Sequence, residues 1–255
     1  MRRPRLLRTH AAAPGLRVAL AGIAVAASLA AVACGGDSPT GPPPALRELP
    51  RALTTTERAA VAGSNRFAWD LLRRVHEAAP DSSAFLSPLS ASVALAMTAM
   101  GADGDTWTQM RDMLGFQGVE RDAMAQAYAG LTDLILGLDP TVELAVANAL
   151  WHRRGEVLET PFLDAVRTHF DARVEGLDFG DPAALGTING WVEDATRGRI
   201  DEIVKTIPGN VVLYLMNAVY FKGSWRYRFD PADTRTADFH TGEGEAAPVR
   251  MMYSS

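Results

Sequence analysis

The chain has 255 residues, of which 47% are hydrophobic and 22% are charged, so it is a globular protein of one large or two small domains rather than a disordered one. Its net charge at pH 7 is −5, and the five arginines of residues 1–34, which contain no Asp or Glu, leave −10 on the remainder. This acidity argues against nucleic acid or a heparin-like polyanion as a partner, because such ligands are bound through concentrated positive charge.

Residues 1–34 have the pattern of an export signal. An arginine-rich start is followed by an apolar run over 18–33, and small residues then lead into Cys34. This arrangement resembles a bacterial lipoprotein signal. It predicts that Cys34 becomes the lipidated first residue of an exported protein, held at a membrane of the cell envelope or lying outside the cell. The alternative is an ordinary signal peptide in which Cys34 is incidental. As the only cysteine, Cys34 excludes an intrachain disulfide.

Residues 35–53 predict a flexible tether. The segment is rich in Pro and Gly and shows no hydrophobic periodicity. The folded domain is therefore expected over 54–255, so the chain divides into a signal, a tether and one domain.

The first helix is predicted over 54–79. Thr54 and Glu57 have the spacing of a capping box, and Pro80 ends the helical pattern of apolar residues.

The second helix is predicted over 88–100. Ser87 is in the N-cap position and Pro88 in the first helical position, and the helix is apolar nearly all round, so it should be buried. Further helices are expected over 106–114, 119–138, 160–170 and 181–197.

Alternating apolar residues predict strands over 141–151 and 174–179, with further strand candidates near Phe239 and over 249–253. A series of helices that comes mostly before the strands predicts an α+β fold rather than an alternating α/β one.

The most distinctive stretch is residues 211–225, which read VVLYLMNAVYFKGSW. Both sets of alternate residues are largely apolar, so the strand is expected to lie inside a large sheet with both faces covered. Asn217 interrupts one apolar face. A buried amide without a hydrogen bond costs a few kcal/mol, so Asn217 is expected to belong to a local polar network.

No motif for catalysis or metal binding is visible. The histidines lack the spacing of a helical metal site, and the chain has neither a Gly-x-Ser-x-Gly turn nor a phosphate-binding glycine loop. We therefore expect no metal, no cofactor and no enzymatic activity. Only a catalytic triad assembled from distant residues, as in an envelope hydrolase, stays open as an enzymatic alternative.

Several blocks of the sequence together resemble the serpin family of serine protease inhibitors. They cover about residues 65–252, nearly the whole expected domain, and occur in the family's order. The blocks are NRFAWDLL at 65–72, FLSPLS at 85–90, ANALW at 147–151, INGWV at 188–192 and LMNAVYFKGSW at 215–225. The resemblance implies helices packed on a large mixed sheet, in which 211–225 is the central strand.

The resemblance also implies a mechanism and a set of conformational residues. Serpins are cleaved by a target protease, of the serine or the cysteine type, in an exposed reactive loop that then inserts as a new strand beside the central one. By this resemblance, Ser87, Ser90 and Asn217 match the shutter where the sheet opens, and Trp225 matches the breach where insertion begins. Each also has a simpler structural role, as a helix cap, a first-turn residue, a buried amide and a core tryptophan.

The sequence departs from the family pattern because the expected reactive loop and the strands after it do not occur in residues 1–255. No reactive bond can be assigned. The chain is therefore expected to be C-terminally incomplete and not inhibitory by itself. The alternative is a non-inhibitory or degenerate serpin-like binding domain of the cell envelope.

Overall fold

The computed structural model describes residues 48–242 and 244–253. Residues 1–47 fall outside this range, and with them the predicted export signal, Cys34 and most of the predicted tether. The described residues form six α-helices, five strands and one short 3-10 helix, and four of the helices precede the first strand. This order agrees with the predicted α+β class.

Helix α1 (Thr55–Ala78) begins with the predicted capping box. The Glu57 backbone N–H donates to Thr54 Oγ1 at 3.1 Å, and the Thr54 backbone N–H donates to Glu57 Oε2 at 2.7 Å. Arg51 donates two further hydrogen bonds to the Glu57 carboxylate and one to the Gly130 carbonyl of α4 (Arg121–Leu136). Arg51 and the Thr54 N–H lower the pKa of Glu57 to about 2. The Arg51–Glu57 pair therefore fastens the start of α1 to α4.

Helix α2 (Pro88–Met100) is buried, as predicted. Six of its thirteen residues are buried, and α1, α3 (Gly104–Met113), α4 and α5 (Thr160–Phe170) pack around it. These helices share one apolar core, whose buried members include Met97, Leu114, Phe116, Met124, Tyr128, Val166 and Phe170.

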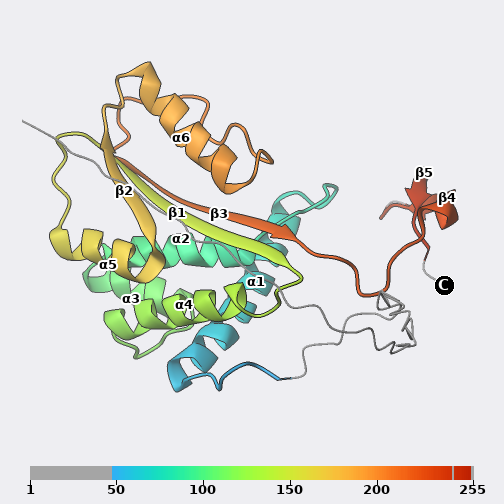
Figure 1. Cartoon of the computed structure of the whole chain (residues 1–255), viewed down its shortest axis with the longest axis horizontal. Coiled ribbons are helices and arrows are strands. Elements are labelled where there is room, and N and C mark those ends of the chain that lie inside the picture. Colours follow the sequence, from blue (N-terminus) through green and yellow to red (C-terminus); the bar gives the residue numbers. More distant parts are fainter. Residues whose placement is uncertain (1–47, 243, 254–255) are drawn as a thin grey trace, which may run out of the picture. The chain divides into compact units, whose positions relative to one another are not determined.

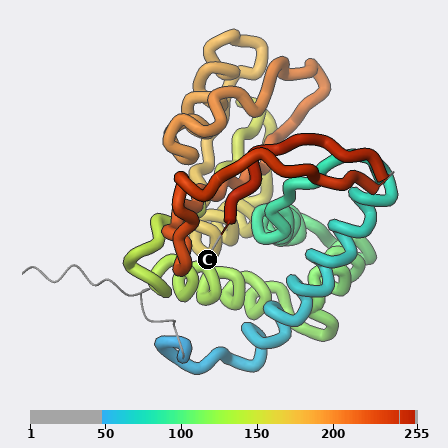
Figure 2. Tube along the Cα trace, turned by 90° about the vertical axis from the view of Figure 1, so that its right-hand side faces the viewer, coloured from blue at the N-terminus to red at the C-terminus, as the bar shows by residue number. Residues whose placement is uncertain are grey.

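Three strands form the main sheet in the order β2-β1-β3. The middle strand, β1 (Glu143–Arg153), pairs in parallel with β2 (Ala172–Leu177) and antiparallel with β3 (Leu213–Lys222). Figure 1 shows α2, α4 and α5 on one side of this sheet and α6 (Pro182–Ala195) on the other. The same division is visible in Figure 2, where α6 lies opposite α1 and α4.

The face of the sheet under α6 has a second core. Trp151 of β1 is fully buried there, and its ring meets Trp191 of α6 edge-on, with the centroids 6.0 Å apart. Met216 of β3 and Leu177 of β2 belong to the same cluster. All three strands therefore take part in fixing α6.

Strands β4 (Arg235–His240) and β5 (Ala246–Met251) form a separate antiparallel pair after the short helix η1 (Pro231–Asp233). They agree with the strands expected near Phe239 and over 249–253, although β5 begins three residues earlier and ends at Met251.

The structure corrects the expectation for residues 211–225. The strand is shorter, 213–222, and among the described residues it pairs only with β1, so it is an edge strand and not an interior one. The expected cover on both faces is also incomplete, since Phe221 is 68% exposed. The apolar pattern shows that the strand's side chains prefer to be buried, but it does not show which segment packs against them.

Candidate functional site at the edge of β3

Asn217 lies in a short chain of amides that crosses the sheet. Its Nδ2 donates to Asn148 Oδ1 at 2.8 Å, and Asn148 Nδ2 donates in turn to the Phe170 carbonyl at 2.7 Å. The two asparagines are direct partners in the β1–β3 register. The prediction that Asn217 belongs to a polar network is confirmed.

The network is incomplete at its β3 end. Asn217 Oδ1 is buried and accepts no hydrogen bond from any residue that the structure describes. An unsatisfied buried acceptor costs about 1–3 kcal/mol. Among the described residues, Asn217 Oδ1 therefore has no donor, and the edge of β3 that faces away from β1 has no partner strand.

Ser87 and Ser90 form the start of α2. Ser87 Oγ donates to Ser90 Oγ at 2.9 Å and accepts from the Ser90 backbone N–H at 3.3 Å, so the simple capping role of Ser87 is present. Helix α2 packs against β3, but none of the hydrogen bonds of the described residues joins either serine to Asn217. The structure places the pair under the same strand without connecting it to the amide.

Trp225 lies beyond the end of β3. Its side chain is 69% exposed and contacts Phe229 edge-on, with the ring centroids 5.7 Å apart. The alternative of a core tryptophan is therefore wrong for the described residues. Among the hydrogen bonds and ring contacts of the described residues, none joins Trp225 to Ser87, Ser90 or Asn217.

Sequence reasoning missed Asn148. It stands in an apolar strand just as Asn217 does, and this shared irregularity was the available signal. The pairing itself depends on the register of two strands 69 residues apart in the chain.

A cluster of charged side chains lies where β1 begins and β3 ends. Glu143, at the start of β1, accepts hydrogen bonds from Lys222 at the end of β3 and from Arg197 after α6. Lys222 and Arg197 together hold the pKa of Glu143 below its usual value. The Arg197 guanidinium also lies over the Tyr220 ring, 4.5 Å from its centroid. This cluster ties the chain after α6 to β1 and β3.

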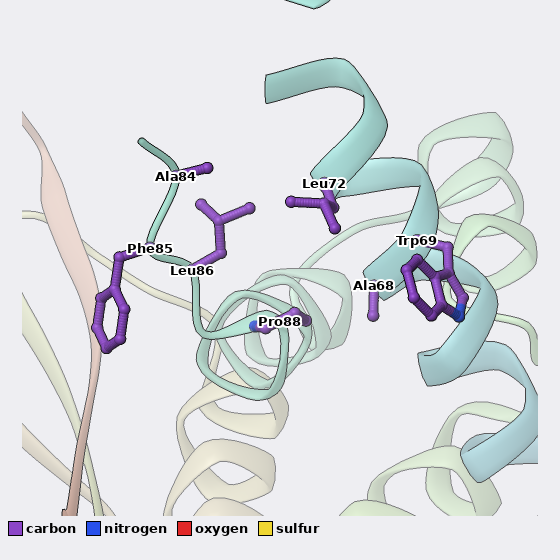
Figure 3. Close-up of a pocket in the computed structure, with 7 residues that line it drawn as sticks. All are labelled: Ala68, Trp69, Leu72, Ala84, Phe85, Leu86 and Pro88. Atoms are coloured by element: carbon purple, nitrogen blue, oxygen red, sulfur yellow. The ribbon is translucent and has the colours of Figure 1, made fainter. Parts of the chain in front are cut away.

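An apolar hollow of about 360 Å³ lies between α1 and the segment that leads into α2. Figure 3 shows Ala68, Trp69 and Leu72 of α1 on one side and residues 84–86 on the other, with Pro88 at the start of α2. Trp69 is 73% exposed and Phe85 fully exposed. Large apolar side chains are thus solvent-exposed next to the Ser87 cap.

The described residues contain no group of three or more His, Cys, Asp or Glu placed to hold a metal ion. In the same part of the chain, no helix has both the length and the apolar character needed to cross a bilayer.

Comparison with known proteins points to one family. The family model described as Serpin (serine protease inhibitor) matches residues 62–255. Corticosteroid-binding globulin of Oryctolagus cuniculus is 31% identical over 87% of this chain and 55% of its own length. The leukocyte elastase inhibitor of Bos taurus is 35% identical over 75% of this chain and 51% of its own.

Solved structures agree with these sequence matches. Cleaved kallistatin complexed with heparin has a TM-score of 0.71 and 26% identity, over 77% of this chain and 58% of that one. Reactive-loop-cleaved human thyroxine-binding globulin has a TM-score of 0.71 and 28% identity, over 77% of this chain and 59% of that one. The chain spans about half the length of the curated relatives it matches.

Proposed function

The chain belongs to the serpin family and has a serpin-like fold, and from this premise we propose that the protein inhibits serine proteases by adding a strand beside β3. The partner is a target protease that cleaves a reactive loop and is trapped when the loop inserts. The family contains inhibitors such as the leukocyte elastase inhibitor of Bos taurus, which supports this activity.

The observation that carries the proposal is that one edge of β3 has no partner strand in the part of the chain that the structure describes. Its outward backbone N–H and C=O groups can hydrogen-bond an added strand. Asn217 Oδ1 is a buried acceptor without a donor in the described residues. A strand that brings a donor to Asn217 is stabilised both along its backbone and at this amide.

Three of the predicted conformational residues, Trp225, Ser87 and Ser90, have roles in the same proposal. Trp225 stands three residues beyond the end of β3, exposed, where an entering strand meets it first. Ser87 and Ser90 begin the helix beneath β3, and their small side chains leave room for the sheet to move over that helix.

The proposal places the reactive loop outside residues 1–255. The support is that the chain spans about half of its relatives, together with the unpaired edge of β3. The 255-residue chain should therefore not inhibit a protease by itself, whereas the product of the natural reading frame, read to its stop codon, should do so.

The test is to incubate both proteins with trypsin-like and subtilisin-like proteases. We expect the full reading-frame product to inhibit at least one of them and to form a complex that survives SDS, with the 255-residue chain as the inactive control. An SDS-stable complex with the shorter chain would refute the placement of the loop. Cleavage of the longer product without inhibition would refute the inhibitory function.

A second candidate is a non-inhibitory binding protein. Its support is that the relatives include corticosteroid-binding globulin and that the hollow of Figure 3 exposes apolar side chains. This function predicts that the full product is cut as an ordinary substrate by every protease tested.

The cellular location is also a proposal. Cys34 after the apolar run supports an exported protein with a lipid anchor in the bacterial cell envelope. An intact mass of the protein made in a bacterial host should show a chain that begins at Cys34 and carries acyl groups. Replacement of Cys34 with Ala should release the protein from the membrane fraction, and a mature chain without acyl mass would exclude the anchor.

A further inference from the structure

The chain that follows β3 is positively charged, and we call residues 222–229 the basic end. Figure 1 shows the chain leaving β3 and running on beyond the sheet before it reaches β4. The basic end contains Lys222, Arg226 and Arg228 and no Asp or Glu, in a protein whose net charge is −5. The next carboxylate along the chain, that of Asp230, caps the short helix η1. Positive charge is therefore concentrated where the strand with the open edge ends.

These positive charges are only partly neutralised. Lys222 donates a hydrogen bond to Glu143, but Glu143 also accepts one from Arg197, so one carboxylate is shared by two cations. Arg226 and Arg228 are exposed, and neither belongs to an ion pair among the described residues. A partner with negative charge therefore meets two free guanidinium groups at this end of β3.

Aromatic side chains accompany the guanidinium groups. Trp225 and Tyr227 are 69% and 66% exposed. Trp225 contacts Phe229 edge-on, with the ring centroids 5.7 Å apart, and the Arg226 guanidinium lies over the Tyr227 ring, 5.8 Å from its centroid. Trp, Tyr and Arg are the residue types that contribute most to the affinity of protein interfaces. The composition of the basic end is thus typical of a binding surface.

The neighbouring edge of β3 indicates the shape of the partner. Among the described residues this edge has no partner strand, and its outward N–H and C=O groups can pair with an extended backbone. A segment that pairs with β3 and runs past its end reaches Arg226 and Arg228. Backbone pairing depends little on sequence, whereas a guanidinium group selects carboxylates, which it binds through two parallel hydrogen bonds.

We propose that the segment that adds beside β3 carries Glu or Asp at the end that reaches Arg226 and Arg228. This inference rests on the proposed strand addition and names the chemistry of the added segment. The acidic residues are attracted before pairing begins, and they favour the register that places them against the basic end. A nucleic acid or another polyanion supplies the charge but no backbone that pairs with a strand, so an acidic extended peptide is the partner that fits both features.

Three matched peptides test the charge preference. Fluorescence anisotropy measures the binding of labelled peptides of alternating Thr and Ala that carry Glu-Ser-Glu-Ser, Gln-Ser-Gln-Ser or Lys-Ser-Lys-Ser at either terminus. We expect the Glu peptide to bind the 255-residue chain about three- to tenfold more tightly than the Gln peptide, and the Lys peptide to bind most weakly. The differences should shrink as salt is added. Equal affinities, or no binding by any of the peptides, would overturn the inference.

Two double variants locate the preference. Arg226→Gln with Arg228→Gln removes two exposed charges from the basic end, and Arg74→Gln with Arg154→Gln removes two exposed charges from α1 and from the segment after β1. We expect the Glu and Gln peptides to bind the first variant equally and the control variant with the original difference. Thermal unfolding checks that both variants are folded. A preference that survives in the first variant would overturn the role of these arginines.

N-methylation of the Glu peptide separates strand pairing from attraction of charge alone. Methyl groups on the alternate amides that face β3 should abolish binding, whereas methyl groups on the other amides should not, because only the first set removes hydrogen bonds to the strand. Binding that tolerates both sets, or tighter binding of a single-stranded oligonucleotide, would overturn the inference in favour of a polyanion. Failure of the full reading-frame product to inhibit a protease would refute the proposed function and leave a measured peptide preference standing.

Discussion

Strands β1 and β3 are neighbours in one sheet, yet they differ in how they are paired and in how completely their asparagine side chains are hydrogen-bonded. From Asn148 on, β1 is paired on both sides, and Asn148 uses both amide atoms in hydrogen bonds. Among the described residues β3 is paired on one side, and its Asn217 uses only one. Within one network, Asn148 of β1 is thus fully hydrogen-bonded, whereas Asn217 of β3 keeps an acceptor without a donor among the described residues. The difference teaches that, in the strand addition we propose, the added strand pairs where the backbone and Asn217 of β3 still have unpaired hydrogen-bonding groups among the described residues.

The largest expected effect contrasts two tryptophans. Trp151 of β1 is fully buried, so Trp151→Ala should cost about 3–5 kcal/mol of unfolding free energy. Trp225, beyond β3, is 69% exposed, so Trp225→Ala should change it by less than about 0.5 kcal/mol. Urea unfolding of both variants measures the contrast. A large loss in Trp225→Ala would show that the region beyond β3 is packed.

The two asparagines should also differ. Asn148→Ala removes the partner of the Phe170 carbonyl and of Asn217 Nδ2 together, and we expect a loss of about 2–3 kcal/mol. Asn217→Ala removes one hydrogen bond but also the unsatisfied Oδ1, so its loss should be about 1 kcal/mol or less. Urea unfolding of the two variants measures the difference between these losses. Equal losses would mean that the network is not open at β3.

Hydrogen exchange tests the edge directly. Amides of β1 from Asn148 on should be protected on both sides, because this part of the strand pairs with both β2 and β3. In β3, the amides that point away from β1 should exchange at least about tenfold faster than those that point toward it. Mass spectrometry with short peptides or NMR can resolve the alternation. Uniform protection of β3 would show that its second edge is covered.

A smaller effect on the free energy of unfolding is expected from the Glu57 carboxylate at the start of α1. The pKa of Glu57 is lowered to about 2, so its contribution to stability is complete above its unfolded pKa of about 4.3 and is lost as the pH falls toward 2. Glu57→Gln should cost about 1 kcal/mol at pH 7 and flatten the stability profile between pH 4.5 and 2.

Glu143→Gln is the matched control for Glu57, since Glu143 is paired at an exposed position next to β3. Its effect should be smaller and should vanish in high salt. A profile for Glu57→Gln that is as steep as that of the natural chain would contradict the role of the Arg51–Glu57 pair.

Interactions between residues close together in the sequence determined where the first two helices begin. The capping box of Thr54 and Glu57 and the start at Ser87 and Pro88 depend on residues no more than three positions apart, so α1 and α2 begin where the sequence predicts. The long apolar stretch around Asn217 was correctly recognised as a strand, and the family resemblance on the surrounding blocks is confirmed.

Only the tertiary structure determined which segments of the chain contact β3. That Asn217 meets Asn148 and that one side of β3 has no partner in residues 48–242 and 244–253 both depend on segments far apart in the chain. Periodicity reports that a residue prefers to be buried, because burial of apolar surface is nondirectional. Hydrogen bonds are directional, and only the folded arrangement shows which of them are made.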